Sequence, residues 1–223
     1  MSIADKLTAI AENVQKVYEA GKAAGGGEVE NPYYYARYAN ETFQSAVFPE
    51  NYNLVIKAQK PFFSASGMCR SAQNLNSIKL VCEDMGATTK TRFSAFCREC
   101  ASVKTVDLTE YQRVLGSDFG YCFYLATALE SIYGALDMSN VTNATYAFFC
   151  GSLVDVEFVP STISVDVRFN SAKLSDASVD SIIAGLADLT GSAAKTLTLN
   201  GVGSKLTDAQ KATISAKNWT LAV

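Results

Sequence analysis

The chain of 223 residues contains no histidine. Without imidazole there is no Ser-His-Asp or Cys-His activation of a nucleophile and no His-ligated metal. There is also no side chain whose ordinary pKa lies near neutrality. Catalysis would have to use carboxylates, Lys, Tyr or Cys. This absence lowers the expectation of an enzyme, and we predict a non-enzymatic protein that uses no cofactor.

Long apolar runs and basic clusters are absent as well. No stretch approaches 18 apolar residues, and the first 21 residues alternate charge with single apolar residues. The sequence therefore predicts no secretion signal and no membrane insertion. A net charge of −3 and scattered Lys and Arg argue against a nucleic-acid partner. The 48% apolar content is that of a globular protein with a buried core.

Six cysteines without a secretion signal are expected to be reduced. Cys97 and Cys100 form a C-x-x-C pair, a spacing typical of a redox pair or of half a zinc site. A zinc site needs a second pair at matching spacing, and the sequence has none. We favour packing for this pair and predict no metal site, with metal or redox chemistry as the alternative.

Four segments share an L/V-x-x-I/V pattern, anchored at Leu75, Val103, Leu129 and Leu153. The anchors recur roughly every 24 to 28 residues, an interval that shortens along the chain and lies within that of leucine-rich repeats, roughly 20 to 29 residues. Three residues before each anchor stands a small residue, and seven before stands a larger one. The two columns are Ala72, Cys100, Ala126, Cys150 and Met68, Phe96, Cys122, Tyr146. Cys100 thus shares a position with Ala, as expected for a thiol that packs as a small apolar group.

Each repeat is expected to contribute a short strand with inward residues at period 2. These pairs are Ile78 and Leu80, Val106 and Leu108, and Val156 and Phe158. The third repeat, with "SIYGALDM", departs from the pattern and predicts a bulge or longer turn at Gly134.

The segment "NVTNATYAFFCGSLVDVEF", residues 140 to 158, is the closest match in the chain to an F-x-x-C-x-x-L-x-x-[IV]-x-[LF] core, which it follows from Cys150 onward. It resembles the BspA-like class of bacterial leucine-rich repeats. The resemblance implies an α/β, β-rich leucine-rich-repeat solenoid with an N-terminal helix and an α/β C-terminal cap. The expected parts are a heptad helix and Gly-rich linker (1–27), an aromatic N-terminal cap (28–62), repeats (63–170) and a C-terminal cap (171–223). The aromatic region has a ligand-stacking patch as its alternative interpretation.

The opening "SIADKLTAIAENVQKVYEAG" and the closing "AKNWTL" resemble phage-encoded and prophage-encoded leucine-rich-repeat proteins of gut bacteria. This resemblance implies a tail-associated virion protein, made in the bacterial cytoplasm, that adheres to a protein or glycan on a bacterial surface. The alternatives are a bacterial cell-surface adhesin and a purely structural virion component.

Three helices are expected outside the repeats, one at the N-terminus and two near the C-terminus. At the N-terminus a heptad seam predicts a homo-oligomer, a trimer before a dimer, or docking to a tail assembly. Its residues are Ile3, Leu7, Ile10, Val14 and Val17. Packing of this helix on its own domain is the alternative. Near the C-terminus a helix begins at Ser175, "KTLTLN" predicts a strand, Thr207 caps a short helix and "NWTLAV" predicts a final strand.

The outward strand positions are the predicted binding face, with Tyr133 as the energetic anchor. They are Ser77, Lys79, Thr105, Asp107, Ser131, Tyr133, Asp155 and Glu157. Asp155 and Glu157 stand about 7 Å apart by strand geometry. A carboxylate-based glycoside hydrolase is therefore the remote alternative.

Overall fold

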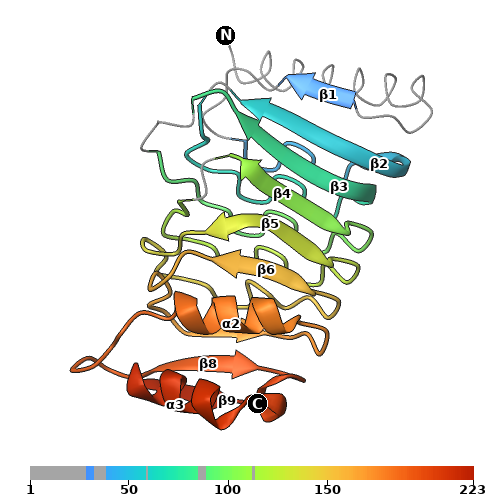
Figure 1. Ribbon diagram of the computed structural model, residues 1–223. Coiled ribbons are helices and arrows are strands. Elements are labelled where there is room, and N and C mark those ends of the chain that lie inside the picture. Colours follow the sequence, from blue (N-terminus) through green and yellow to red (C-terminus); the bar gives the residue numbers. More distant parts are fainter. Residues whose placement is uncertain (1–28, 33–38, 59, 85–88, 112–113) are drawn as a thin grey trace.

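The computed structural model describes residues 29–32, 39–58, 60–84, 89–111 and 114–223. In this part of the chain two parallel sheets combine with two α-helices in an α/β fold (Figure 1). The first sheet contains β1 (Val29–Pro32), β2 (Val47–Ala58), β3 (Gln73–Cys82), β4 (Thr105–Glu110), β5 (Ser131–Leu136) and β6 (Asp155–Phe158). The second contains β7 (Val167–Phe169), β8 (Lys195–Leu199) and β9 (Trp219–Ala222). The helices are α2 (Asp176–Gly185) and α3 (Asp208–Ala216), and a 3-10 turn covers Gly203–Lys205.

The strands of each sheet follow one another in chain order, and each pairs in parallel with the next. In the first sheet Ile78, Val106, Ile132 and Val156 are in register and are all buried. The residues expected to point inward, such as Leu80, are buried too, so the period-2 reading of these strands is confirmed. The register shifts after Ile132, and Gly134 has a φ of 97°, as predicted for a bulge there.

A second ladder of backbone hydrogen bonds joins the turns that precede the strands. The Gly67 N–H donates to the Ser94 carbonyl at 2.8 Å, and the Ala95 N–H donates to Gly120 at 2.9 Å. The Tyr121 N–H likewise donates to the Thr145 carbonyl at 2.8 Å. Residues at the donor position have left-handed backbone, with φ of 61°, 52° and 56° in these three turns. Each turn thus satisfies its backbone on its neighbour rather than within a helix.

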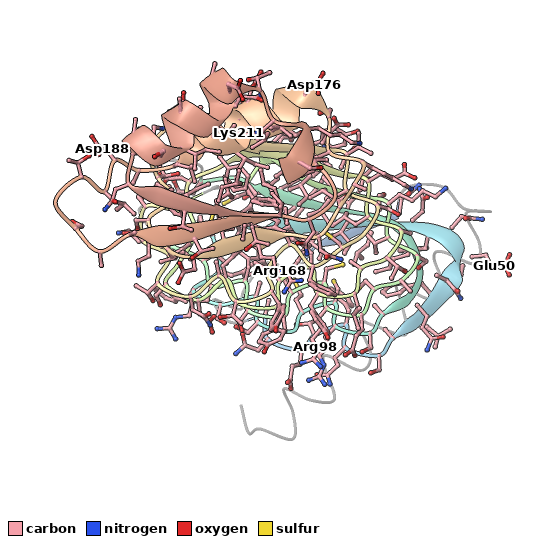
Figure 2. The ribbon with its side chains drawn as sticks, turned by 90° about the horizontal axis from the view of Figure 1, so that it is seen from below. Glu50, Arg98, Arg168, Asp176, Asp188 and Lys211 are labelled. Carbon is pink, nitrogen blue, oxygen red and sulfur yellow. The ribbon has the colours of Figure 1, made fainter. Side chains whose placement is uncertain are left out.

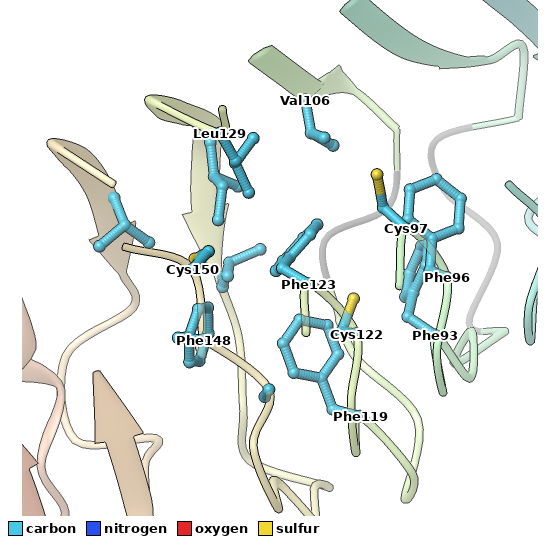
Figure 3. Close-up of a cluster of buried hydrophobic side chains, with 14 of the residues drawn as sticks. Phe93, Phe96, Cys97, Val106, Phe119, Cys122, Phe123, Leu129, Phe148 and Cys150 are labelled. Carbon is cyan, nitrogen blue, oxygen red and sulfur yellow. The ribbon is translucent and has the colours of Figure 1, made fainter. Parts of the chain in front are cut away.

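Between the strands and the turns lies a core of stacked aromatic rings and thiols (Figure 3). Phe119 and Phe148 lie 5.6 Å apart by ring centroids, and Phe148 stacks on Phe169 at 4.7 Å. Cys97 and Cys100 are both fully buried in this core, as the packing interpretation requires. The Cys100 Sγ donates to the Cys69 carbonyl, 2.7 Å away. All six cysteines are unbridged.

Helix α2 lies along the outer edge of β6 (Figure 1) and ends the first sheet. The Val156 N–H donates to the Ser178 hydroxyl, and the Phe158 N–H donates to Ser181, both at 2.9 Å. Two side-chain hydroxyls therefore take the bonds that a seventh strand would have made. The turn ladder continues instead, because Phe148 forms a parallel bridge to Phe169 of β7.

These features correct the predicted fold class. A leucine-rich-repeat solenoid implied one series of similar repeats across residues 63–170, with caps at both ends. The structure has two separate parallel sheets, and its strands shorten from 12 residues in β2 to 4 in β6. Residues 47–58, expected inside an aromatic cap, form the longest strand of the first sheet. The α/β class stands, and the leucine-rich-repeat assignment does not.

The local predictions for the C-terminal region are confirmed. Ser175 caps α2 by accepting from the Ser178 N–H, and Thr207 caps α3 in a capping box with Gln210. The segments "KTLTLN" and "NWTLAV" supply β8 and β9. The heptad seam of residues 3 to 17 and the predicted linker lie outside the described residues.

Candidate functional site

The first sheet brings the predicted binding residues onto one surface, called here the strand face. Pairing places Ser77 beside Thr105, Thr105 beside Ser131, and Ser131 beside Asp155. A second row runs from Lys79 to Asp107 and Tyr133. Glu157 lies on the same strand as Asp155, and both side chains are exposed. The period-2 reading therefore assembled this group correctly in space.

Most polar groups on the strand face already have partners within the chain. Lys79 forms an ion pair with Glu110 at 2.7 Å, and Oδ1 of Asp107 accepts from the backbone and hydroxyl of Thr109. Ser77 donates to the Asn53 side chain at 2.7 Å. Ser131 is only 7% exposed, so it supports the face from beneath and is not available as a contact.

Tyr133 stands out from these neighbours because 47% of its surface is exposed. It lines two depressions. One, of about 310 Å³, also includes Asn53, Asn76 and Thr105. The other, of about 350 Å³, lies between β5, β6 and the start of α2. An aromatic side chain that borders two hollows can contact a ligand from either side.

The depression between β5, β6 and α2 contains the two carboxylates considered for hydrolysis. Asp155 accepts from the Ser131 hydroxyl at 3.3 Å through Oδ2 and from the Ser175 hydroxyl at 3.2 Å through Oδ1. Glu157 lines the same hollow. Both oxygens of Asp155 are thus held by serine hydroxyls, an arrangement that orients a carboxylate as a hydrogen-bond acceptor.

The turns carry a second, partly exposed group, the aromatic–arginine surface. It consists of Arg98, Tyr121, Tyr124, Tyr146, Phe149 and Arg168. The Arg98 guanidinium lies 5.6 Å from the ring centroids of both Tyr121 and Tyr124. At the other end the Arg168 guanidinium lies 5.2 Å from the Phe149 ring. Figure 2 labels both arginines.

The four rings of the aromatic–arginine surface contact one another closely. Tyr146 lies 5.6 Å from both Tyr121 and Phe149, and Tyr124 stacks on Phe149 at 5.5 Å. The carboxylate of Glu99 receives a hydrogen bond from Ser71 and also pairs with Arg98, and these contacts lower the pKa of Glu99. Arg98 is therefore neutralised at one end of this surface.

A hollow of about 260 Å³ adjoins the other end of the aromatic–arginine surface. Its walls come from the turn before β6 and from the outward face of the second sheet. They comprise Ala144, Thr145, Tyr146, Asp166, Val167, Arg168, Thr196 and Thr198. The Thr196 N–H donates to Asp166 at 2.7 Å, which fixes the carboxylate at the rim.

Tyr146 shares the position seven residues before an anchor with Met68, Phe96 and Cys122, but those three are buried and Tyr146 is 39% exposed. The left-handed residues Gly67, Ala95 and Tyr121 stand eight positions before their anchors, whereas Tyr146 stands seven before Leu153. The fourth turn is thus one residue shorter, and Tyr146 takes the outward left-handed position. The interval between anchors shortens steadily from Leu75 to Leu153, and this shortening was the available signal.

No family model matches the chain, and neither a curated protein nor a solved structure matches it. Among the described residues, no helix is long and apolar enough to cross a membrane. Over the same residues, no three Cys, Asp or Glu side chains gather as a metal-binding group. The two surfaces are therefore the features of the molecule that bear on its function.

Proposed function

We propose that this protein is a non-enzymatic binding module that adheres to a macromolecule on a bacterial surface through its strand face. The observation that carries the proposal is Tyr133, an exposed aromatic ring between two depressions on an otherwise paired polar surface. Tyrosine is among the residue types that dominate binding energy at protein surfaces. Its neighbours hold one another in place, so the face is organised before a ligand arrives.

The sequences of the two terminal segments bear on where the protein is found. Their resemblance to phage-encoded proteins supports a tail-associated virion protein, and mass spectrometry of purified virions tests it. A protein of a bacterial cell surface is the competing assignment, and it predicts the chain in washed cell envelopes instead. Both settings leave the role of Tyr133 unchanged.

The hydrolase alternative draws support from one observation, the hollow that Asp155 and Glu157 share. Release of reducing ends from bacterial surface polysaccharide, abolished in Glu157→Gln, would establish it. We favour binding because both oxygens of Asp155 are engaged by serine hydroxyls.

The test of the binding proposal uses fluorescently labelled full-length protein on a panel of intact gut bacteria. On strains that bind it, Tyr133→Ala should lower the affinity at least about tenfold, the loss expected for an aromatic anchor. Tyr133→Phe keeps the ring and should retain most of the binding. Phe63→Ala, at an exposed ring outside both surfaces, is the matched control for removal of an exposed aromatic side chain. Failure to bind any strain, or equal binding by Tyr133→Ala, would refute the proposal.

A further inference from the structure

The hollow beside Tyr146 combines aromatic, hydroxyl-bearing and charged residues. Its lining includes the exposed Tyr146, the threonines of β8, Asp166 and Arg168. A ligand that fits them needs an apolar face for the ring and several hydroxyl groups for the polar atoms. A pyranose sugar has both, because its C–H groups gather on one face and its hydroxyls lie around the edge.

The side chains around the hollow are held in place by the fold. Tyr146 is braced by the rings of Tyr121 and Phe149. With the Asn200 amide oriented so that its oxygen faces Arg168, the guanidinium donates two hydrogen bonds to it, at 2.9 and 3.2 Å. Thr198 lies beside Arg168 in the register of the second sheet. A preorganised site of this kind loses little conformational entropy when a ligand binds.

The charges around the hollow decide which sugars are accepted. Asp166 and Arg168 balance each other formally, and the chain as a whole carries −3. A phosphate or carboxylate group would be attracted by the Arg168 guanidinium but repelled by the Asp166 carboxylate. A neutral hydroxyl group can donate to Asp166 and accept from Arg168, so both rim groups favour it.

The size of the hollow sets the length of the ligand that it takes. At about 260 Å³ it lies just below the range of roughly 300–1,000 Å³ typical of sites for larger small molecules. A hollow of this size can accommodate one sugar ring. The tyrosines beyond Tyr146 offer further aromatic surface to the rest of a glycan chain.

We infer that the hollow formed by Tyr146, Asp166, Arg168, Thr196 and Thr198 binds one neutral hexose unit of a glycan, stacked on the Tyr146 ring. This site is separate from the strand face and does not depend on the function proposed there. A protein with both sites would contact a bacterial surface at two points, and two weak contacts in one molecule gain strength through effective concentration.

The experiment titrates the full-length chain with neutral oligosaccharides of glucose, galactose, mannose and N-acetylglucosamine, each about six units long. A polyuronate of similar length serves as the acidic comparison. Saturation-transfer NMR detects binding, and we expect at least one neutral series to bind with a Kd on the order of 1 mM or tighter. Tyr146→Ala should weaken that binding at least about tenfold, because it removes the aromatic anchor of the site. Tyr146→Phe should restore it.

Two controls separate this inference from the proposed function. Tyr133→Ala should leave oligosaccharide binding unchanged, and thermal unfolding should show that Tyr146→Ala is folded. If no neutral series binds, if Tyr146→Ala binds as well as the unaltered chain, or if the polyuronate binds more tightly, the inference is wrong. Each of these results leaves the cell-binding test of Tyr133 standing on its own.

Discussion

In the turns between residues 119 and 149, aromatic side chains point both into the core and away from it. Phe119, Phe123 and Phe148 are at most 1% exposed, whereas Tyr146, on the same turns, is 39% exposed. The inward positions hold phenylalanine, and the outward positions hold mostly tyrosine. A buried hydroxyl needs a partner, whereas an exposed one can meet water or a ligand. The inward rings therefore contribute to stability, and the outward rings are the ones that we propose for recognition.

Phe148 and Phe149 give the sharpest test of this division, because they are adjacent in the chain and face opposite ways. Phe148 packs against Phe119, Phe158 and Phe169 in the core. Phe148→Ala should lower the free energy of unfolding by about 3–5 kcal/mol, the cost of a large buried cavity. Phe149 is half-buried and contacts the outer rings and the Arg168 guanidinium, so Phe149→Ala should cost less, about 1 kcal/mol.

Urea unfolding of both variants provides the measurement. Equal losses of stability for Phe148→Ala and Phe149→Ala would show that the outer rings are as structural as the inner ones. The division between stability and recognition would then have no basis.

The buried thiols of the core make the stability of the fold depend on pH, and this dependence can be measured. Burial raises the pKa of Cys97 and Cys122 well above the ordinary value, and it raises that of Cys150 to about 12. A folded-state pKa above the unfolded value of 9.0 gives stability that is fully present below pH 9. This stability is lost as the pH rises toward the folded pKa, because only the unfolded chain then releases the proton.

Each such thiol contributes a slope of up to about 1.4 kcal/mol per pH unit in this window. Cys122→Ala should therefore make the fall in stability between about pH 9 and 10.5 shallower by about 1 kcal/mol per unit on average, because the unfolded thiol is only half ionised at pH 9. Urea unfolding at several pH values measures the slope. Thr145→Ala, an outward change that removes no ionisable group, should retain the original slope. An unchanged slope in Cys122→Ala would mean that the thiol is not buried as described.

Much of the strand side of the molecule could be predicted from the sequence. Alternation at period 2 identified Ile78, Val106 and Val156 as inward residues, because strand geometry leaves only two faces. It also grouped the strand-face residues correctly in space. Local signals such as Ser175 and Thr207 marked helix starts because capping acts within four residues.

The turn side could not be predicted in the same way. Its left-handed residues are mostly not glycine, since Ala95, Tyr121 and Tyr146 all adopt positive φ. Hydrogen bonds to the neighbouring turn hold this backbone, and residue preference gives no local sign of them. The end of the first sheet was missed for a related reason. A helix pattern predicts α2, but it does not show that Ser178 and Ser181 face the edge of a strand.

The way the first sheet ends tests how the two ladders of hydrogen bonds differ. The strand ladder stops where Ser178 and Ser181 accept from the β6 backbone, whereas the turn ladder runs on into β7. Ser178→Ala leaves the Val156 N–H without its partner at a site where Ser178 itself is only 4% exposed. A buried N–H without an acceptor costs about 1–3 kcal/mol, so the free energy of unfolding should fall by that amount. Ser215→Ala, the same change on the exposed surface of α3, should leave stability within about 0.5 kcal/mol. If Ser178→Ala is as stable as Ser215→Ala, water replaces the hydroxyl at this edge, and the helix ends the sheet by covering it rather than by bonding to it.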